Sequence, residues 1–254
     1  MNASPDLRAQ IEAFPALQPA PETPRNSPIE AVLLTNGDLD HVLGLFLLRE
    51  GTSLRVHATP AVRETLSGPP PSPGLLDLLK SFCGLDWCEP PSDFVPLLLR
   101  NGARSGLSYR AILLPGDPPR FSKIGTLPKA GHSVAYEIVD EKSGALLLVA
   151  PDVAALTPEL RSAITRANAI LFDGTFWTGN EMHGIHSEAR TATQMGHLPI
   201  HGGSLETLGA ASARLKIYLH INNTNPILAA SSPERTQVEG AGIIVGADGM
   251  QFEL

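Results

Sequence analysis

Short apolar runs alternate with amphipathic stretches along the chain, and this alternation predicts strands followed by helices. Apolar, β-branched runs predict strands at 31–35, 54–58, 109–114, 133–139, 145–149, 169–172, 216–221, 243–245 and 250–254. Apolar residues at helical spacing predict helices at 41–50, 59–66, 75–82, 157–167, 204–213 and 233–240. The polar residues 140–144 join two strand-like runs and predict a hairpin. Hairpins mixed with strand–helix units predict a layered α/β fold with mixed sheets.

Composition favours one compact domain over residues 1–254. The chain has 254 residues, of which 43% are hydrophobic and 18% charged. Prolines crowd two segments, 13–28 and 68–74, and they disfavour helix because proline lacks a backbone donor. We therefore expect an extended surface segment at 13–28 and a break between helices at 68–74.

Charge and apolar content exclude several classes of partner. Lys and Arg total 19 against 26 Asp and Glu, and the net charge of −7 argues against nucleic-acid binding. The N-terminal residues lack the features of a signal peptide, and no apolar run reaches the ~18 residues of a membrane helix. The two cysteines, Cys83 and Cys88, match neither a redox motif nor a paired zinc site and are expected in the core. These features predict a soluble, cytoplasmic protein without nucleic-acid or membrane partners.

The densest polar cluster follows the predicted strand 31–35. Alternate residues of an extended segment share a face, so Asn36, Asp38 and Asp40 can converge beside His41, where the next helix begins. One alternative is that Asp38 or Asp40 only caps that helix. The other is a metal site, because carboxylates and an imidazole crowded together need a cation between them.

Two further strands end in residues that ligate metals. The strand 169–172 is followed by Asp173, and the strand 216–221 carries His220 near its end. Taken singly, Asp173 is a common turn residue before glycine, and His220 is typical of a buried, hydrogen-bonded histidine. Taken together with the first cluster, they supply the histidine and carboxylate ligands of a catalytic divalent metal site.

These segments also resemble a known family. Residues 36–45 (NGDLDHVLGL) are similar to the HxHxDHxxG signature of the metallo-β-lactamase fold. The chain resembles the pyrroloquinoline quinone (PQQ) biosynthesis protein B family over essentially its whole length. The segments that carry this resemblance are 2–8, 34–50, 172–175, 195–197, 220–226 (HINNTNP) and 248–250. The resemblance implies a four-layer αββα metallo-β-lactamase-like sandwich with mixed sheets.

The resemblance also implies a particular set of metal ligands. The two histidines that open the signature fall on Asn36 and Asp38, and the separate mid-chain histidine has only His132 as a poor candidate. The first metal site of the superfamily is therefore largely lost. The remaining ligands fall on four residues, Asp40, His41, Asp173 and His220. This set implies one divalent metal, with Fe(II) favoured and Zn possible.

The function implied by this resemblance is coenzyme PQQ biosynthesis. Two histidines and a carboxylate fit a non-haem Fe(II) oxygenase that hydroxylates the tyrosine-derived ring of a Glu–Tyr-derived precursor. Asp38 is then a base or an orienting partner of a ligand, and His197 transfers a proton or contacts substrate, although a structural role for His197 is equally open. Two alternatives are a carrier that binds PQQ or its precursor, and a zinc hydrolase. A homodimer is possible.

The start of the chain differs from the start of the family. Family members begin with a glycine-rich strand and a CxCxxC cluster that holds a structural zinc, and residues 1–254 contain neither. We therefore expect the opening strands of one sheet to be missing and part of its edge or core surface to be uncovered.

Overall fold

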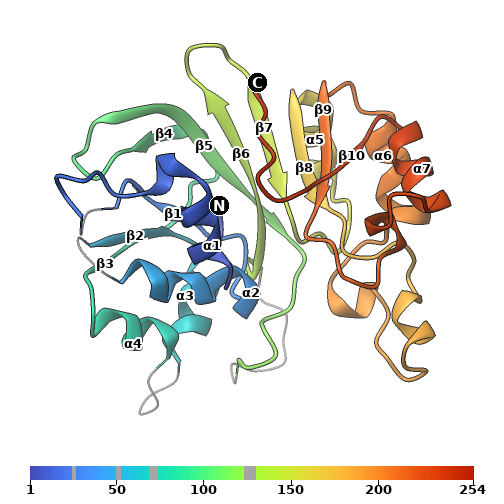
Figure 1. Cartoon of the computed structure of the whole chain (residues 1–254), viewed down its shortest axis with the longest axis horizontal. Coiled ribbons are helices and arrows are strands. Elements are labelled where there is room, and N and C mark those ends of the chain that lie inside the picture. Colours follow the sequence, from blue (N-terminus) through green and yellow to red (C-terminus); the bar gives the residue numbers. More distant parts are fainter. Residues whose placement is uncertain (25–26, 50–52, 69–73, 123–129) are drawn as a thin grey trace.

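The fold is described from a computed structural model, which describes residues 1–24, 27–49, 53–68, 74–122 and 130–254. Its strands form two sheets (Figure 1). The smaller sheet has the order β1-β2-β3, and the larger has the order β10-β9-β8-β7-β6-β5-β4. The strands are β1 (Val32–Leu33), β2 (Leu54–His57), β3 (Leu85–Cys88), β4 (Val95–Leu98), β5 (Arg104–Leu114), β6 (Ser133–Asp140), β7 (Leu146–Ala150), β8 (Ala169–Asp173), β9 (Leu215–Leu219) and β10 (Ile244–Val245).

The larger sheet is mixed, as the sequence predicts. Strands β4 to β7 pair antiparallel, whereas β7, β8, β9 and β10 pair parallel. The predicted hairpin is confirmed, since β6 and β7 pair with Tyr136 opposite Val149. Because β7, β8 and β9 run in the same direction, their carboxyl ends lie at one edge of the sheet.

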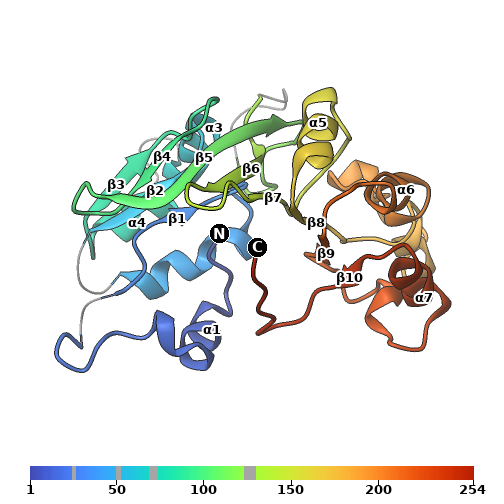
Figure 2. The same ribbon diagram turned by 90° about the horizontal axis from the view of Figure 1, so that it is seen from above.

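Helices cover the outer faces of the two sheets. Figures 1 and 2 show α3 and α4 beside the small sheet, and α5, α6 and α7 beside the carboxyl-terminal strands. The α-helices are α1 (Leu7–Ala13), α2 (Leu39–Val42), α3 (Pro60–Ser67), α4 (Leu75–Lys80), α5 (Pro158–Arg166), α6 (Leu205–Gly209) and α7 (Pro233–Gly240). Shorter helical turns are η1 (Pro15–Leu17), η2 (Leu43–Leu48), η3 (Glu181–Gly184), η4 (Thr193–Met195), η5 (Ile200–Ser204) and η6 (Pro226–Leu228).

Three buried clusters hold the layers together. One cluster packs helices such as α5 and α7 on the larger sheet, through Leu160, Val238 and Ile170. A second packs α3 and α4 on the small sheet, and the third joins the two sheets where Leu33 meets Tyr109. The order helix, sheet, sheet, helix confirms the expected four-layer αββα sandwich.

Helix starts were predictable from Thr-Pro pairs. The Thr59 hydroxyl accepts a hydrogen bond from the Val62 amide (3.2 Å), and Thr157 accepts one from Leu160 (3.2 Å). Proline follows each threonine, so the missing amide costs no hydrogen bond. The predicted ranges include the capping threonine, and the helices themselves begin at the proline that follows it, Pro60 and Pro158.

The structure corrects several predicted elements. The helix predicted over 41–50 is an α-helical turn, α2, followed by the 3₁₀ helix η2, and Glu50 lies outside the described residues. The break has a packing cause: the Gly44 amide donates to the Ala3 carbonyl (2.8 Å), and a Cβ on Gly44 would lie 2.3 Å from the Ser4 carbonyl oxygen. The helix predicted over 204–213 ends already at Gly209, a residue of low helix propensity.

The prediction also missed elements and placed one wrongly. Strands β3 and β4 were not predicted, because Asp86 and Pro96 interrupt their apolar runs. Helix α1 was not predicted either, and 250–254 contains no strand. Part of the proline segment forms η1, and most of 68–74 lies outside the described residues.

The carboxyl-terminal strands face a cavity of about 680 Å³, lined by apolar residues such as Leu171 and Ile217 and by the polar residues His220, Arg235 and Asp248. The expectation that opening strands of the family are missing stays a prediction.

Among the described residues, no helix has the length and apolar character that crossing a bilayer requires.

Candidate metal centre

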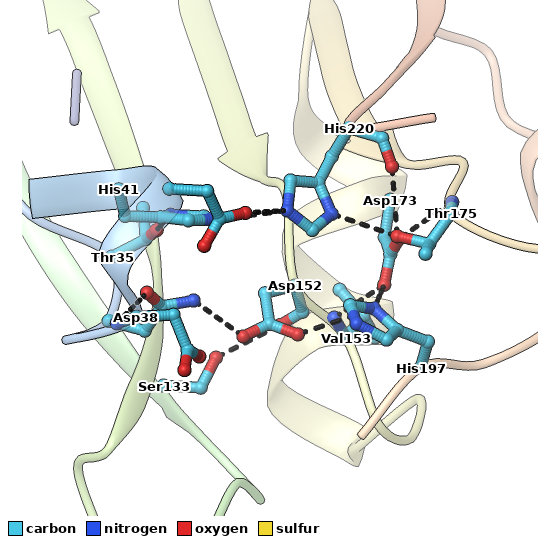
Figure 3. A network of polar contacts seen from close by, with 12 residues as sticks. Thr35, Asp38, His41, Ser133, Asp152, Val153, Asp173, Thr175, His197 and His220 are labelled. Carbon is cyan, nitrogen blue, oxygen red and sulfur yellow. Dashed lines mark hydrogen bonds and ion pairs between the residues drawn. The ribbon is translucent and has the colours of Figure 1, made fainter. Parts of the chain in front are cut away.

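Polar side chains from four strand ends meet at one place (Figure 3). The segment after β1 carries Asp38 and His41, and β7, β8 and β9 are followed or ended by Asp152, Asp173 and His220. The sequence predicts this meeting for three of the four strand ends. The fourth, at Asp152, was missed.

The first candidate ligand group consists of Asp40, His41 and His220. The two imidazole Nε2 atoms lie 3.0 Å apart, and Asp40 Oδ2 lies 3.2 Å from His220 Nε2 and 3.5 Å from His41 Nε2. Ligand atoms about 2.1 Å from one ion are about 3.0 Å apart at right angles and about 3.4 Å apart at tetrahedral angles. The three atoms therefore fit the donor set of a single divalent ion, and they match the facial set of two histidines and a carboxylate.

Two of the three residues in this group carry the charge that a bound cation requires. Burial and the neighbouring His220 lower the pKa of His41 to about 4, so this imidazole is neutral at pH 7 and keeps a free lone pair. The hydrogen bond with His220 lowers the pKa of Asp40 to about 2, so its carboxylate is ionised. Burial lowers the pKa of His220, but the hydrogen bond with Asp40 and the charges of Asp173 and Asp152 raise it overall, so a proton on His220 must leave when a cation binds.

The second candidate group consists of Asp173, His197 and His220. The sequence predicts Asp173 as a ligand or as a close neighbour of the ligands, and the structure groups it with His197 and His220. Asp173 is buried, and its two oxygens accept bonds from the Thr175 amide (3.0 Å), the Thr175 hydroxyl (2.6 Å) and the Val153 amide (2.9 Å). Its Oδ2 also lies 2.8 Å from His197 Nδ1.

His197 therefore lies in the site. The sequence alone did not decide between a functional and a structural role for this residue. Burial lowers the pKa of His197, but the hydrogen bond and charge of Asp173, with the charges of Asp152 and Asp38, raise it to about 8. His197 is therefore mainly protonated at pH 7 in this arrangement, and it can donate a proton toward the site.

The two groups share His220. His220 Nδ1 lies 2.8 Å from the Thr175 hydroxyl, and Nε2 faces Asp40 and His41. A neutral imidazole has one unprotonated nitrogen, so this side chain can ligate one ion at a time. His220 also has a φ of 58°, in the left-handed region, which explains why β9 ends at Leu219 rather than at the predicted residue 221.

Two residues after β1, Asn36 and Asp38, lie beside Asp152 and form a separate polar cluster with it. The Asn36 Nδ2 atom donates to Asp152 Oδ2 (2.6 Å), and the Asn36 Oδ1 atom accepts from the Asp38 amide (3.0 Å). Asp38 stands at the start of α2 but its side chain makes no capping bond, so the capping interpretation fails for Asp38. Burial, with the charges of Asp152 and Asp40, raises the pKa of Asp38 to about 6.

Sequence reasoning also missed the residues that orient His41. Asn2 Nδ2 lies 2.8 Å from His41 Nδ1, and the Thr35 hydroxyl lies 3.2 Å from the same atom. Asn2 precedes every predicted element, so no pattern points to it. His132 is buried and belongs to neither ligand group among the described residues, in line with its poor standing as a mid-chain ligand.

Comparison with known proteins defines the class first. The family described as Beta-lactamase superfamily domain matches residues 1–221, so the chain belongs to this superfamily. A solved structure, the zinc-bound PqqB from Methylobacterium extorquens, is similar to this fold with a TM-score of 0.84 and 34% identity. That alignment covers 100% of this chain and 82% of that chain.

Curated relatives narrow the class to one family. The coenzyme PQQ synthesis protein B of Cupriavidus necator is 38% identical over 261 residues, which cover 100% of this chain and 82% of that protein. The protein of the same name from Rhizobium meliloti is 40% identical over 259 residues, with coverage of 100% and 80%. The chain belongs to the coenzyme PQQ synthesis protein B family, as its sequence motifs indicate.

Proposed function

We propose that this protein acts in PQQ biosynthesis as a non-haem Fe(II)-dependent oxygenase that hydroxylates the tyrosine-derived ring of a Glu–Tyr-derived precursor. The observation that carries the proposal is the group of Asp40, His41 and His220, whose donor atoms lie 3.0 to 3.5 Å apart. Two imidazoles and one carboxylate leave coordination positions open, and a ferrous ion held there would supply the dioxygen chemistry.

The reaction balances with an external reductant. A ring C–H bond is replaced by C–OH with one oxygen atom of dioxygen, and the other oxygen atom leaves as water. Two electrons and two protons come from a small-molecule reductant such as ascorbate.

The residues around the ligands are suited to handling the protons. Asp38 accepts a proton most readily near pH 6, because burial and neighbouring carboxylates raise its pKa to about 6. His197 is 2.8 Å from Asp173 and can return a proton to the site. We therefore assign Asp38 as the base near the substrate ring and His197 as a proton donor.

The sharing of His220 by the two candidate groups counts against a two-metal hydrolase. Such hydrolases hold two ions about 3.5 to 4 Å apart. Here Asn36 occupies one expected histidine position, and both ends of its amide are engaged by Asp152 and by the Asp38 backbone. Zinc stays an alternative to iron in this site. A similar protein has been solved with zinc bound, and nitrogen and oxygen ligands bind zinc more tightly than ferrous iron.

Isotope labelling tests the proposed function. Protein reconstituted anaerobically with Fe(II) is given a tyrosine-derived precursor, ascorbate and ¹⁸O₂, and the product is analysed by mass spectrometry. We expect one labelled oxygen per ring, no product from His220→Ala, and unchanged product from His183→Ala, whose exposed imidazole lies 2.7 Å from the Ala189 carbonyl and belongs to neither ligand group of the described residues. Full Fe(II) loading without label would refute the oxygenase. Tight, metal-independent binding of the precursor without chemistry would support a carrier.

A further inference from the structure

The candidate metal centre opens into a cavity of about 270 Å³. Ligand residues Asp40, His41 and His220 line it, together with the loop after β5 and the loop that leads to His197. These two loops contribute two arginines to the lining, Arg120 and Arg190. Neither arginine is a metal ligand or a proton carrier in the function proposed above.

Both arginines are exposed and have no carboxylate partner within the described ranges. Several other arginines of the described residues are paired, as Arg55 is with Asp86 (2.8 Å) and Arg110 is with Glu137 (2.6 Å). The Arg190 Nη1 atom donates to the Gln194 carbonyl at 2.9 Å, which ties this side chain to the loop that carries His197. Most N–H donors of each guanidinium group are therefore available to bind an anion.

Acidic side chains also line the cavity. Asp38, Asp40, Asp117 and Asp152 lie there beside three histidines, so the carboxylates of a substrate are repelled wherever no cation compensates these charges. Arginine is the side chain best suited to bind carboxylates, because its planar fork makes two parallel charge-assisted hydrogen bonds. The two arginines are therefore suited to hold the acidic groups of a carboxylated substrate.

The size of the cavity points to the same orientation. A volume of about 270 Å³ lies just below the usual range of about 300 to 1,000 Å³ for pockets that enclose small ligands. It admits one aromatic ring more readily than a whole bicyclic or cross-linked amino acid. The remainder of such a substrate would lie at the opening, where both arginines are exposed.

We propose that Arg120 and Arg190 bind the carboxylates of an amino-acid-derived aromatic substrate with at least two acidic groups, and thereby direct its ring toward Asp40, His41 and His220. This inference rests on the proposed function and adds the substrate class and the residues that select it. Exposed ion pairs weaken with salt, so the selection also depends on ionic strength.

The experiment measures binding without turnover. The zinc-loaded protein is titrated with PQQ, an aromatic tricarboxylate, and with its trimethyl ester, which has the same ring system without the charges. We expect the wild type to bind PQQ at least about tenfold more tightly than the ester, the effect of one charge-assisted hydrogen bond. Arg120→Gln and Arg190→Gln are each expected to weaken PQQ binding about tenfold and to leave ester binding unchanged.

Controls separate this proposal from folding and from the oxygenase reaction. Arg161→Gln removes an exposed arginine on α5 that does not line the cavity, and is expected to bind PQQ like the wild type. Circular dichroism melts check that each variant is folded. Equal affinity for acid and ester, no binding of the acid, or wild-type affinity in both Arg120→Gln and Arg190→Gln would overturn the proposal. Because zinc protein without reductant is used, the result is independent of whether the iron form hydroxylates anything.

Discussion

Thr175 holds the shared ligand His220 in place, and its removal gives a sharp test of the metal centre. The Thr175 hydroxyl lies 2.8 Å from His220 Nδ1, 2.9 Å from the His220 carbonyl and 2.6 Å from Asp173 Oδ1. Thr175→Val keeps the shape of the side chain but deletes all three contacts. His220 then loses the groups that fix both its ring and its left-handed backbone, whose φ is 58°.

The expected effect falls mainly on metal affinity. Loss of a hydrogen-bond partner behind a metal ligand typically weakens binding about 10- to 100-fold, which equals about 1.4 to 2.7 kcal/mol. Asp173 Oδ1 keeps only the Thr175 amide as a donor, at 3.0 Å, so unfolding is also expected to become easier by about 1 to 3 kcal/mol. Thr175→Ser retains the hydroxyl and is expected to bind metal like the wild type.

A competition titration measures this directly. Zinc is titrated into mixtures of protein and a chromophoric chelator, and the dissociation constants of wild type, Thr175→Ser and Thr175→Val are compared at one pH. Denaturant melts of the metal-free proteins give the stability change separately. If folded Thr175→Val binds zinc as tightly as Thr175→Ser, the hydroxyl does not position His220 and the reasoning is refuted.

Three further predictions concern the ligands, pH and a buried ion pair. His41→Ala or His220→Ala is expected to weaken zinc binding at least about 100-fold in the same titration, whereas His183→Ala has no effect. Burial lowers the pKa of His57 from 6.5 to about 4, so the native state loses about 3 kcal/mol as the pH falls from 6.5 to 4. Urea melts of His57→Gln against wild type should show that this loss disappears in the variant. Glu137→Gln, at a fully buried carboxylate between two arginines, is expected to lower the free energy of unfolding by about 3 kcal/mol in urea melts, and an unchanged midpoint would contradict it.

Strand ends were the part of the site that the sequence could predict. Asp173 and His220 could be placed together because the parallel strands β8 and β9 bring their carboxyl ends to one edge. Asp40 and His41 follow β1 of the small sheet, so the packing of the two sheets brings them to that edge. Short apolar runs gave most strands and the hairpin of β6 and β7. These features depend on local periodicity, which a single sequence displays.

Contacts set by tertiary packing could not be predicted in this way. The break between α2 and η2 depends on Gly44 meeting the backbone of Ala3 and Ser4, far from it in the sequence. The contact of Asn2 with His41 Nδ1 depends on the same packing of the first residues against α2. The spacing of apolar residues does not predict such contacts, because they depend on how segments distant in the sequence pack together.

Asp152 is a different case, because the sequence does contain its signal. Asp152 follows the apolar strand β7 after Pro151, just as Asp173 ends β8 and His220 follows β9. A motif that calls for a histidine does not point to an aspartate at the end of a strand. In the structure Asp152 accepts a bond from Asn36 (2.6 Å) and lies 3.4 Å from His197 Nδ1, so it joins the residues after β1 to the second ligand group. Asn36 stands where the superfamily signature has a histidine, so an amide–carboxylate pair lies beside the candidate group of Asp40, His41 and His220.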